Sequence, residues 1–235
     1  MQYNHTVASI SINKGEEKMI TKKQEMNLLV IGSDDDKNTY AVLREWKEGE
    51  GKALVIEIYP TLSPSEQYIK NDLSSFHLMN HVSELGWREM EVVNLYSKVF
   101  SYKPLSRQLK KEDLNTTYIE SLLNETDIKE KDIVIAWGTS LDKHKITNEA
   151  KFDLLKKLKE KGLEKQIKYL VAEDMGENVS VGVHPLFLGL QHSKSHWLLK
   201  QFPLDEEIEK LSKLLAEKPI VKKKGEKKSG YKNSK

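Results

Sequence analysis

The chain has 235 residues and no cysteine, and its 38 lysine and arginine residues nearly balance 36 acidic residues, which leaves a formal charge of +2. This length is typical of one α/β domain and allows a hydrophobic core. The absence of cysteine excludes disulfide bonds, thiolate-bound zinc, iron–sulfur clusters and a cysteine nucleophile. The sequence has no run of about 20 apolar residues and no signal-peptide pattern, so we expect a cytoplasmic protein without membrane contact.

Charge is distributed unevenly along the chain. Residues 218–235 contain eight lysines and one glutamate, so this segment carries +7 and the preceding 217 residues carry −5. This composition predicts a disordered tail whose lysines can contact nucleic-acid phosphates without sequence preference. Residues 1–25 are polar and lack periodicity, which predicts a loose leader. We predict that the remaining residues, 26–217, form a single α/β domain.

Strands and helices are predicted to alternate through this domain. Apolar runs predict strands at 27–32, 40–46, 53–59, 91–95, 132–137 and 167–172. Helices are predicted from Ser63, over 73–85, over 116–123, from Thr147 to Gly162, and over 205–217. The alternation indicates a three-layer αβα sandwich with a mostly parallel central sheet, which can open with an antiparallel hairpin.

The helix over 73–85 has a clear predicted start and a clear predicted face. Asp72 is placed to act as its N-cap. Its apolar residues share one side of the helix, which we therefore expect to be buried. These residues are Leu73, Phe76, Val82 and Leu85.

Ligands of open α/β sheets bind beyond the carboxyl ends of the strands. Here these ends are the places where chemistry is expected: Tyr59-Pro60, Asn94-Leu95, Trp137-Gly138 and the segment that reaches His184-Pro185. Common phosphate-binding and serine-hydrolase motifs are absent. The histidine pairs His77/His81 and His192/His196 have metal-site spacing, but no Asp, Glu or Cys completes either pair in an obvious way, so ordinary surface or partly buried histidines are the favoured interpretation. We therefore predict neither a metal nor a cofactor.

The order of these motifs resembles a bacterial and phage family, domain of unknown function 1643, over about residues 38–192. The family pattern is roughly L-N-P-S-T-A, D-P-T, N-L, A-W-G and H-P-L. The last three motifs match at Asn94-Leu95, Ala136-Trp137-Gly138 and His184-Pro185-Leu186. The first two depart from the pattern, because Tyr59 stands for Asn, and Leu73 and Ser74 stand for Pro and Thr after Asp72.

The same order is similar, more distantly, to the uracil-DNA glycosylase superfamily. This resemblance implies a base-sized pocket at the strand ends, with His184 facing the carbonyl of a flipped base and its loop wedging the duplex. If it extends to activity, it implies an N-glycosidic hydrolase with His184, Asp72 and Asn94 as catalytic residues. The implied ligand-binding residues are Tyr59, Pro60, Ser74, Trp137, Gly138 and Pro185.

Tyr59 stands where glycosidic cleavage uses Asp or Asn, and a phenol is a poor base at neutral pH. Glu57 and Asp72 are alternative carboxylates. The candidates also have structural interpretations: Asp72 as a helix cap, Asn94 as a loop cap, Trp137 as a core residue and His184-Pro185 as a tight turn. Two functions therefore stay open: a protein that binds a nucleobase, nucleotide or nucleic acid, and a catalytically degenerate module that binds DNA or a protein.

Overall fold

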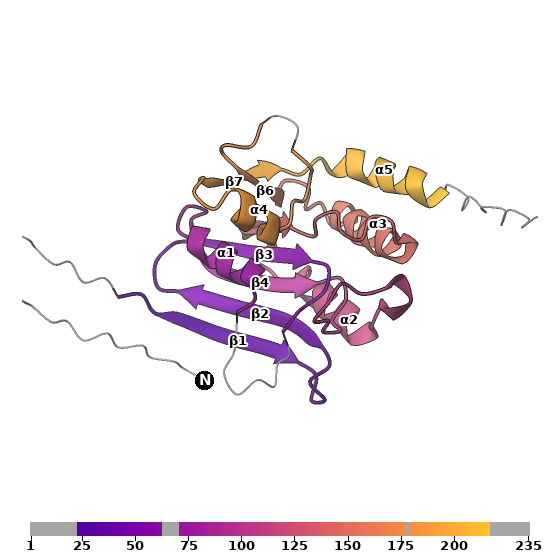
Figure 1. Cartoon of the computed structure of the whole chain (residues 1–235), viewed down its shortest axis with the longest axis horizontal. Helices are drawn as coiled ribbons and strands as arrows, with labels where there is room; N and C mark the ends of the chain where they lie inside the picture. Colours follow the sequence, from indigo (N-terminus) through magenta and orange to yellow (C-terminus); the bar gives the residue numbers. More distant parts are fainter. Residues whose placement is uncertain (1–22, 63–70, 177–178, 217–235) are drawn as a thin grey trace, which may run out of the picture.

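The computed structural model describes residues 23–62, 71–176 and 179–216. Within these residues, seven strands form one sheet in the order β1-β2-β4-β3-β5-β6-β7 (Figure 1). The strands are β1 (Met26–Gly32), β2 (Thr39–Trp46), β3 (Gly51–Glu57), β4 (Trp87–Asn94), β5 (Lys131–Ile135), β6 (Ile167–Ala172) and β7 (Trp197–Gln201). The helices are α1 (Leu73–His81), α2 (Asp113–Leu122), α3 (Lys145–Glu160), α4 (Pro185–Gln191) and α5 (Leu204–Ala216).

The sheet is mixed. Strands β4, β3, β5 and β6 run parallel in its centre. The expected antiparallel hairpin, β1 and β2, forms one edge, and β7 lies antiparallel to β6 at the other. The sheet is therefore less parallel than expected. Strand β7 escapes prediction because only Trp197 of its five residues is buried, so it has no clear apolar pattern.

Two hydrophobic clusters cover the two faces of the sheet, because successive side chains of a strand point to opposite sides. Leu54 and Ile56 of β3 belong to the cluster that includes residues of α2, α3 and α5. Val55 belongs to the other cluster, with Leu78 of α1 and Leu188 of α4. Helices therefore lie on both faces, and Figure 1 shows α1 beside α4.

The predicted buried face of helix α1 is wrong. Leu73 and Phe76 are 63% and 53% exposed. The buried positions are instead Ser74, Ser75, Leu78 and His81. The helix approaches α4 so closely that a Cβ on Gly189 would lie 1.9 Å from the His77 ring. The close approach therefore depends on a glycine in α4, and the inner side of α1 is more polar than its apolar pattern predicts.

Several other predictions are corrected or lie outside the described residues. Helix α3 begins at Lys145, before the expected cap at Thr147, and α4 occupies a segment expected to be a loop. The expected helix start at Ser63, residues 1–22 of the leader and the lysine-rich tail lie outside the described residues. In the part of the chain that is described, no helix is both long enough and apolar enough to cross a membrane.

Candidate functional site

A cavity of about 520 Å³ opens at the carboxyl ends of β3 and β5. The strand order makes this a topological switch point, since the chain leaves β3 for β4 on one side and crosses to β5 on the other. Open α/β sheets bind their ligands at such points. The polar part of the wall comes from Tyr59, Thr139, Ser140, Ser180 and His184, beside Gly138. The apolar part comes from Val183, Leu186, Phe187 and Leu190.

The protonation of His184 follows from its place at the start of α4. Its Nδ1 accepts a hydrogen bond from the Leu186 N–H at 3.2 Å, so it caps the helix. A ring nitrogen that accepts carries no proton, and the proton of the neutral ring is therefore on Nε2. Burial lowers the pKa of His184, although nearby Asp72 opposes this shift. At neutral pH the ring is uncharged and offers Nε2–H as a donor.

Gly138 holds the end of β5 against this histidine. Its φ angle is +61°, a conformation that L side chains rarely adopt, and a Cβ here would lie 2.9 Å from the His184 Cβ. The Gly138 N–H donates to the Gly182 carbonyl at 2.8 Å. The turn after β5 and the loop before α4 are therefore joined at the cavity.

Tyr59 forms another part of the cavity wall. Its half-buried ring meets Phe100 edge-on, with the ring centres 5.8 Å apart. The neighbouring Pro60 is buried, and its carbonyl accepts from the Phe100 N–H. Burial raises the pKa of Tyr59 above its usual value. The phenol therefore stays protonated at neutral pH and can form hydrogen bonds without serving as a base.

A second group of polar side chains lies under α1, and we name it the Arg44 cluster: Arg44, Glu57, Asp72 and Asn94. Glu57 of β3 pairs in register with Asn94 of β4, and Arg44 of β2 pairs with Met90. Met90 belongs to the hydrophobic cluster that includes α1, so these side chains share that face. Arg44, Glu57 and Asn94 are only 1%, 7% and 5% exposed.

Four buried polar atoms of the Arg44 cluster have no hydrogen-bond partner. Arg44 Nη2 donates to Asn71 Oδ1 at 2.7 Å. Its Nε and Nη1, together with Glu57 Oε1 and Asn94 Oδ1, are buried without a hydrogen bond. Burial and the nearby Asp72 carboxylate raise the pKa of Glu57 to about 8, against the opposing effect of Arg44. Glu57 is therefore predominantly a neutral carboxylic acid at pH 7.

Asp72 connects the Arg44 cluster with the cavity. Its Oδ1 accepts from the Ser75 N–H at 2.7 Å and its Oδ2 from the Thr61 hydroxyl at 3.2 Å, which confirms the expected helix cap. Its negative charge raises the pKa of both Glu57 and His184. The two groups of residues therefore share one electrostatic environment.

Residues 40–186 match the family of proteins of unknown function designated DUF1643, which is well over half of the chain. The chain belongs to this family. No curated protein matches, and no solved structure matches. The DUF1643 name assigns no activity, so inferences about function depend on the geometry of the site.

The DUF1643 motifs meet at one end of the sheet but do not line one cavity. Tyr59, Gly138 and His184 line it, whereas Asp72 and Asn94 belong to the Arg44 cluster. Ser74 is buried within α1, and Pro185 is buried in the first turn of α4. Trp137 is separated from the cavity: it is 5% exposed and packs edge-on against Phe202 within the other core. The roles of these residues in binding or catalysis stay predictions.

Sequence reasoning missed Arg44 as a site residue. Val42, Arg44 and Trp46 point to one side of β2, so a charged residue between two apolar ones was an available signal. It also missed Thr139 and Ser140, which follow the Trp-Gly motif directly, and the apolar residues that α4 contributes. The latter could not be found because the segment was expected to be a loop.

Proposed function

We propose that the protein binds a nucleobase in the cavity between β3 and β5, either free or as part of a nucleotide or nucleic acid. Nucleobases are flat and largely apolar, with C=O and N–H groups at their edges. They suit a pocket with apolar walls and a few oriented polar groups. The observation that carries the proposal is the neutral His184, whose Nε2–H is available beside the Tyr59 ring and three hydroxyl groups.

We also propose that the fold is related to that of the uracil-DNA glycosylases. Three features support this relation: four parallel central strands, helices on both faces, and the order of motifs along the strand ends. In this relation, His184 would donate to a carbonyl oxygen of the base. Asn94 would lie near the base edge, at the end of the neighbouring strand.

We propose binding rather than N-glycosidic hydrolysis. Hydrolysis needs a carboxylate or amide that orients water beside the sugar. Among the described residues that line the cavity, none is Asp, Glu or Asn, and Tyr59 stands at the relevant strand end. The carboxyl groups that the sequence offered as alternatives, Glu57 and Asp72, belong to the Arg44 cluster. This favours a catalytically degenerate protein that keeps the ability to bind a base.

Titration of the full chain with uracil, cytosine, adenine and guanine, followed by NMR, tests the proposal. His184→Ala should weaken binding about fivefold, because it removes a donor worth about 1 kcal/mol. His196→Ala is the matched control, since this histidine is exposed, does not line the cavity and pairs with Glu84. A crystal soaked with the bound base should show it between Tyr59 and His184. Absence of binding by any of the four bases, or equal affinity in His184→Ala, would contradict the proposal.

The lysine-rich tail allows a separate test of binding to nucleic acid. Removal of residues 218–235 should flatten the salt dependence of DNA binding, because eight lysines are lost. His184→Ala should leave that slope unchanged, because it removes a base contact and no backbone charge. Tailless protein that still binds single-stranded DNA, but loses this binding with His184→Ala, would place a base of the polymer in the cavity. Tailless protein that binds free bases but no DNA would restrict the function to free bases or nucleotides.

A further inference from the structure

Lys151 of α3 is buried immediately behind the cavity, although it does not line it. It is only 4% exposed, and burial lowers its pKa while the contact with Asp142 opposes that shift. Lysine is rarely buried in proteins unless it is paired. A methionine of similar length would fill the same space without the cost of burying a charge. The charge at this position therefore requires an explanation.

The ammonium group of Lys151 joins the two ends of one turn. Its Nζ donates to Asp142 Oδ1 at 2.7 Å and to the Gly138 carbonyl at 3.3 Å. The turn between these residues contributes Thr139 and Ser140 to the cavity wall. The turn itself has one internal backbone hydrogen bond, from the Asp142 N–H to the Thr139 carbonyl at 3.2 Å.

The surroundings of Lys151 direct its charge toward this turn. The ring of Trp137 lies below Nζ, which is 5.1 Å from the ring centre. Glu207 and Lys210 of α5 have opposite effects on its pKa, and Asp142 is its one ion-pair partner among the described residues. The Gly138 carbonyl is consequently the backbone group on which the cation acts. Gly138 also lies against His184, so the contact reaches the histidine through one residue.

We propose that Lys151 is a positioning residue for the cavity. By holding the Gly138 carbonyl and the Asp142 carboxylate together, it keeps Thr139 and Ser140 in the wall and keeps Gly138 against His184. The ligand part of this inference rests on the proposed binding of a nucleobase, whereas the positioning of the turn does not. The hydrogen bond from Gly138 to Gly182 anchors the start of the turn. At its end, Asn148 Nδ2 donates to the Asp142 carbonyl at 2.8 Å, and Lys151 is the side chain that links this end to Gly138.

Three variants test the inference. Lys151→Met removes the charge and keeps the length, and Lys151→Arg keeps a charge that does not titrate. Lys156→Met is the matched control, because Lys156 is exposed on the same helix and its Nζ lies 5.7 Å from the centre of the Phe152 ring. Two quantities are measured for each variant: the backbone amide shifts of Thr139 and Ser140, and the affinity for cytosine.

In Lys151→Met we expect these two amide shifts to change and the affinity for cytosine to fall about tenfold or more, because small displacements of binding groups are costly. Lys151→Arg should restore most of the affinity, and Lys156→Met should change neither quantity. Cytosine stays uncharged at neutral and mildly alkaline pH. Its binding should weaken at alkaline pH in the unmodified protein as Lys151 loses its proton, and less so in Lys151→Arg.

The outcomes separate this inference from the proposed function. Unchanged amide shifts and unchanged affinity in Lys151→Met overturn the positioning role. If Lys151→Met does not fold, the pH dependence of cytosine binding decides instead. An equal loss of affinity at alkaline pH in the unmodified protein and in Lys151→Arg overturns the positioning role. If the unmodified protein binds no cytosine or other base, the proposed function fails. The amide shifts of Thr139 and Ser140 then still decide whether Lys151 positions the turn.

Discussion

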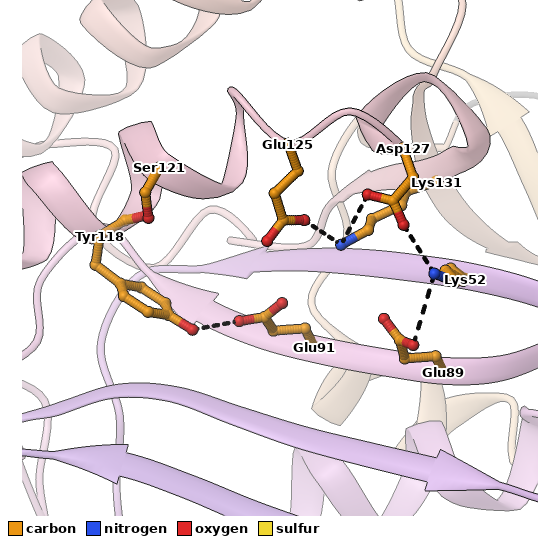
Figure 2. A network of polar contacts seen from close by, with 8 residues as sticks. All are labelled: Lys52, Glu89, Glu91, Tyr118, Ser121, Glu125, Asp127 and Lys131. Carbon is orange, nitrogen blue, oxygen red and sulfur yellow. Dashed lines mark hydrogen bonds and ion pairs between the residues drawn. The ribbon is translucent and has the colours of Figure 1, made fainter.

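Two groups of charged side chains, one buried and one partly exposed, lie on opposite faces of the sheet and toward opposite ends of its parallel strands. The Arg44 cluster lies at the carboxyl ends, under α1. The other group, which we name the amino-end network, lies on the face covered by α2 (Figure 2). It consists of Lys52, Glu89, Glu91, Tyr118, Glu125, Asp127 and Lys131. The two groups differ in whether their buried polar atoms have partners.

Each titratable side chain of the amino-end network meets another one. Lys52 Nζ lies 2.8 Å from Asp127 Oδ2 and 4.0 Å from Glu89 Oε2. Lys131 Nζ lies 2.5 Å from Glu125 Oε2 and 3.9 Å from Asp127 Oδ1. The Tyr118 hydroxyl donates to Glu91 Oε1 at 2.6 Å, as Figure 2 shows. Within the described residues, no side-chain atom of this network is both buried and without a partner.

The Arg44 cluster has the opposite character, because four of its atoms are buried without partners. An unpaired buried polar group costs about 1–3 kcal/mol, whereas a paired one contributes a small net stabilisation. A stable fold does not require such a cluster. From this comparison we predict that the amino-end network supports folding, and that the Arg44 cluster lowers stability and is kept for the adjacent cavity.

The largest expected effect is the loss of stability in Lys131→Met. Lys131 is 7% exposed, and its removal leaves Glu125 and the buried Glu91 without their nearest cation. We expect the free energy of unfolding in urea to fall by at most about 3 kcal/mol, the lower limit for a fully buried ion pair, because the Glu125 side chain is 38% exposed. Lys129→Met, at an exposed neighbouring position, is the control and should change it by less than about 0.5 kcal/mol. Equal effects of the two substitutions would show that the network does not support the fold.

Glu57→Gln should have the opposite sign and stabilise the protein at neutral pH. The pKa of Glu57 is about 8 in the folded protein and near 4.5 in the unfolded chain. As pH rises from about 4.5 to 8, the unfolded chain loses this proton first, so stability falls by about 1.4 kcal/mol per pH unit. The glutamine of Glu57→Gln does not titrate, so the variant does not lose stability in this way as pH rises.

Chemical denaturation at several pH values measures this difference. The free energy of unfolding of Glu57→Gln should be higher than that of the unmodified protein by at most about 3 kcal/mol near pH 7. Near pH 4, where residue 57 is neutral in both proteins, the difference should be small. The same substitution at the exposed Glu48 is the control. A difference that does not vary with pH would show that Glu57 is ionised in the folded protein. The contrast between the two groups of charges would then be lost.

The sequence predicts the elements that carry a strong apolar pattern. The strands over 27–32 and 167–172 agree with β1 and β6 to within a residue, because each is a short apolar run bounded by polar residues or glycine. Strand β7 and helix α4 are not predicted, because each buries few apolar side chains of its own. Their positions depend on tertiary contacts: Trp197 stacks on His81, and Gly189 meets His77.

The site is predicted in outline, because the carboxyl ends of parallel strands meet at one edge of a sheet. This reasoning brings Tyr59, Gly138 and His184 to one cavity. It cannot distinguish the two sides of that edge, and Trp137 consequently lies in the opposite core although its neighbour lines the cavity. It does not point to Arg44, because this residue lies within β2, which runs antiparallel to β4. The signal for Arg44 is instead its charge between the apolar Val42 and Trp46.

Asp72→Asn should have the smallest effect on stability and tests whether the Arg44 cluster and the cavity are coupled. Asparagine caps a helix about as well as aspartate, so near pH 4, where Glu57 is protonated with either residue, the free energy of unfolding should change by less than about 0.5 kcal/mol. The lost negative charge should lower the pKa of both Glu57 and His184, because Asp72 raises both. NMR titration of the Glu57 carboxyl carbon and the His184 ring measures the two shifts. Asp174→Asn is the control, because that carboxylate contacts His192 at 2.8 Å.

If only the pKa of Glu57 falls, the Arg44 cluster is electrostatically separate from the cavity, and its unpaired atoms need an explanation other than base binding. If both fall, protonation of Glu57 and the donor state of His184 respond to the same charge, so a base bound at His184 would sense the charge state of the cluster.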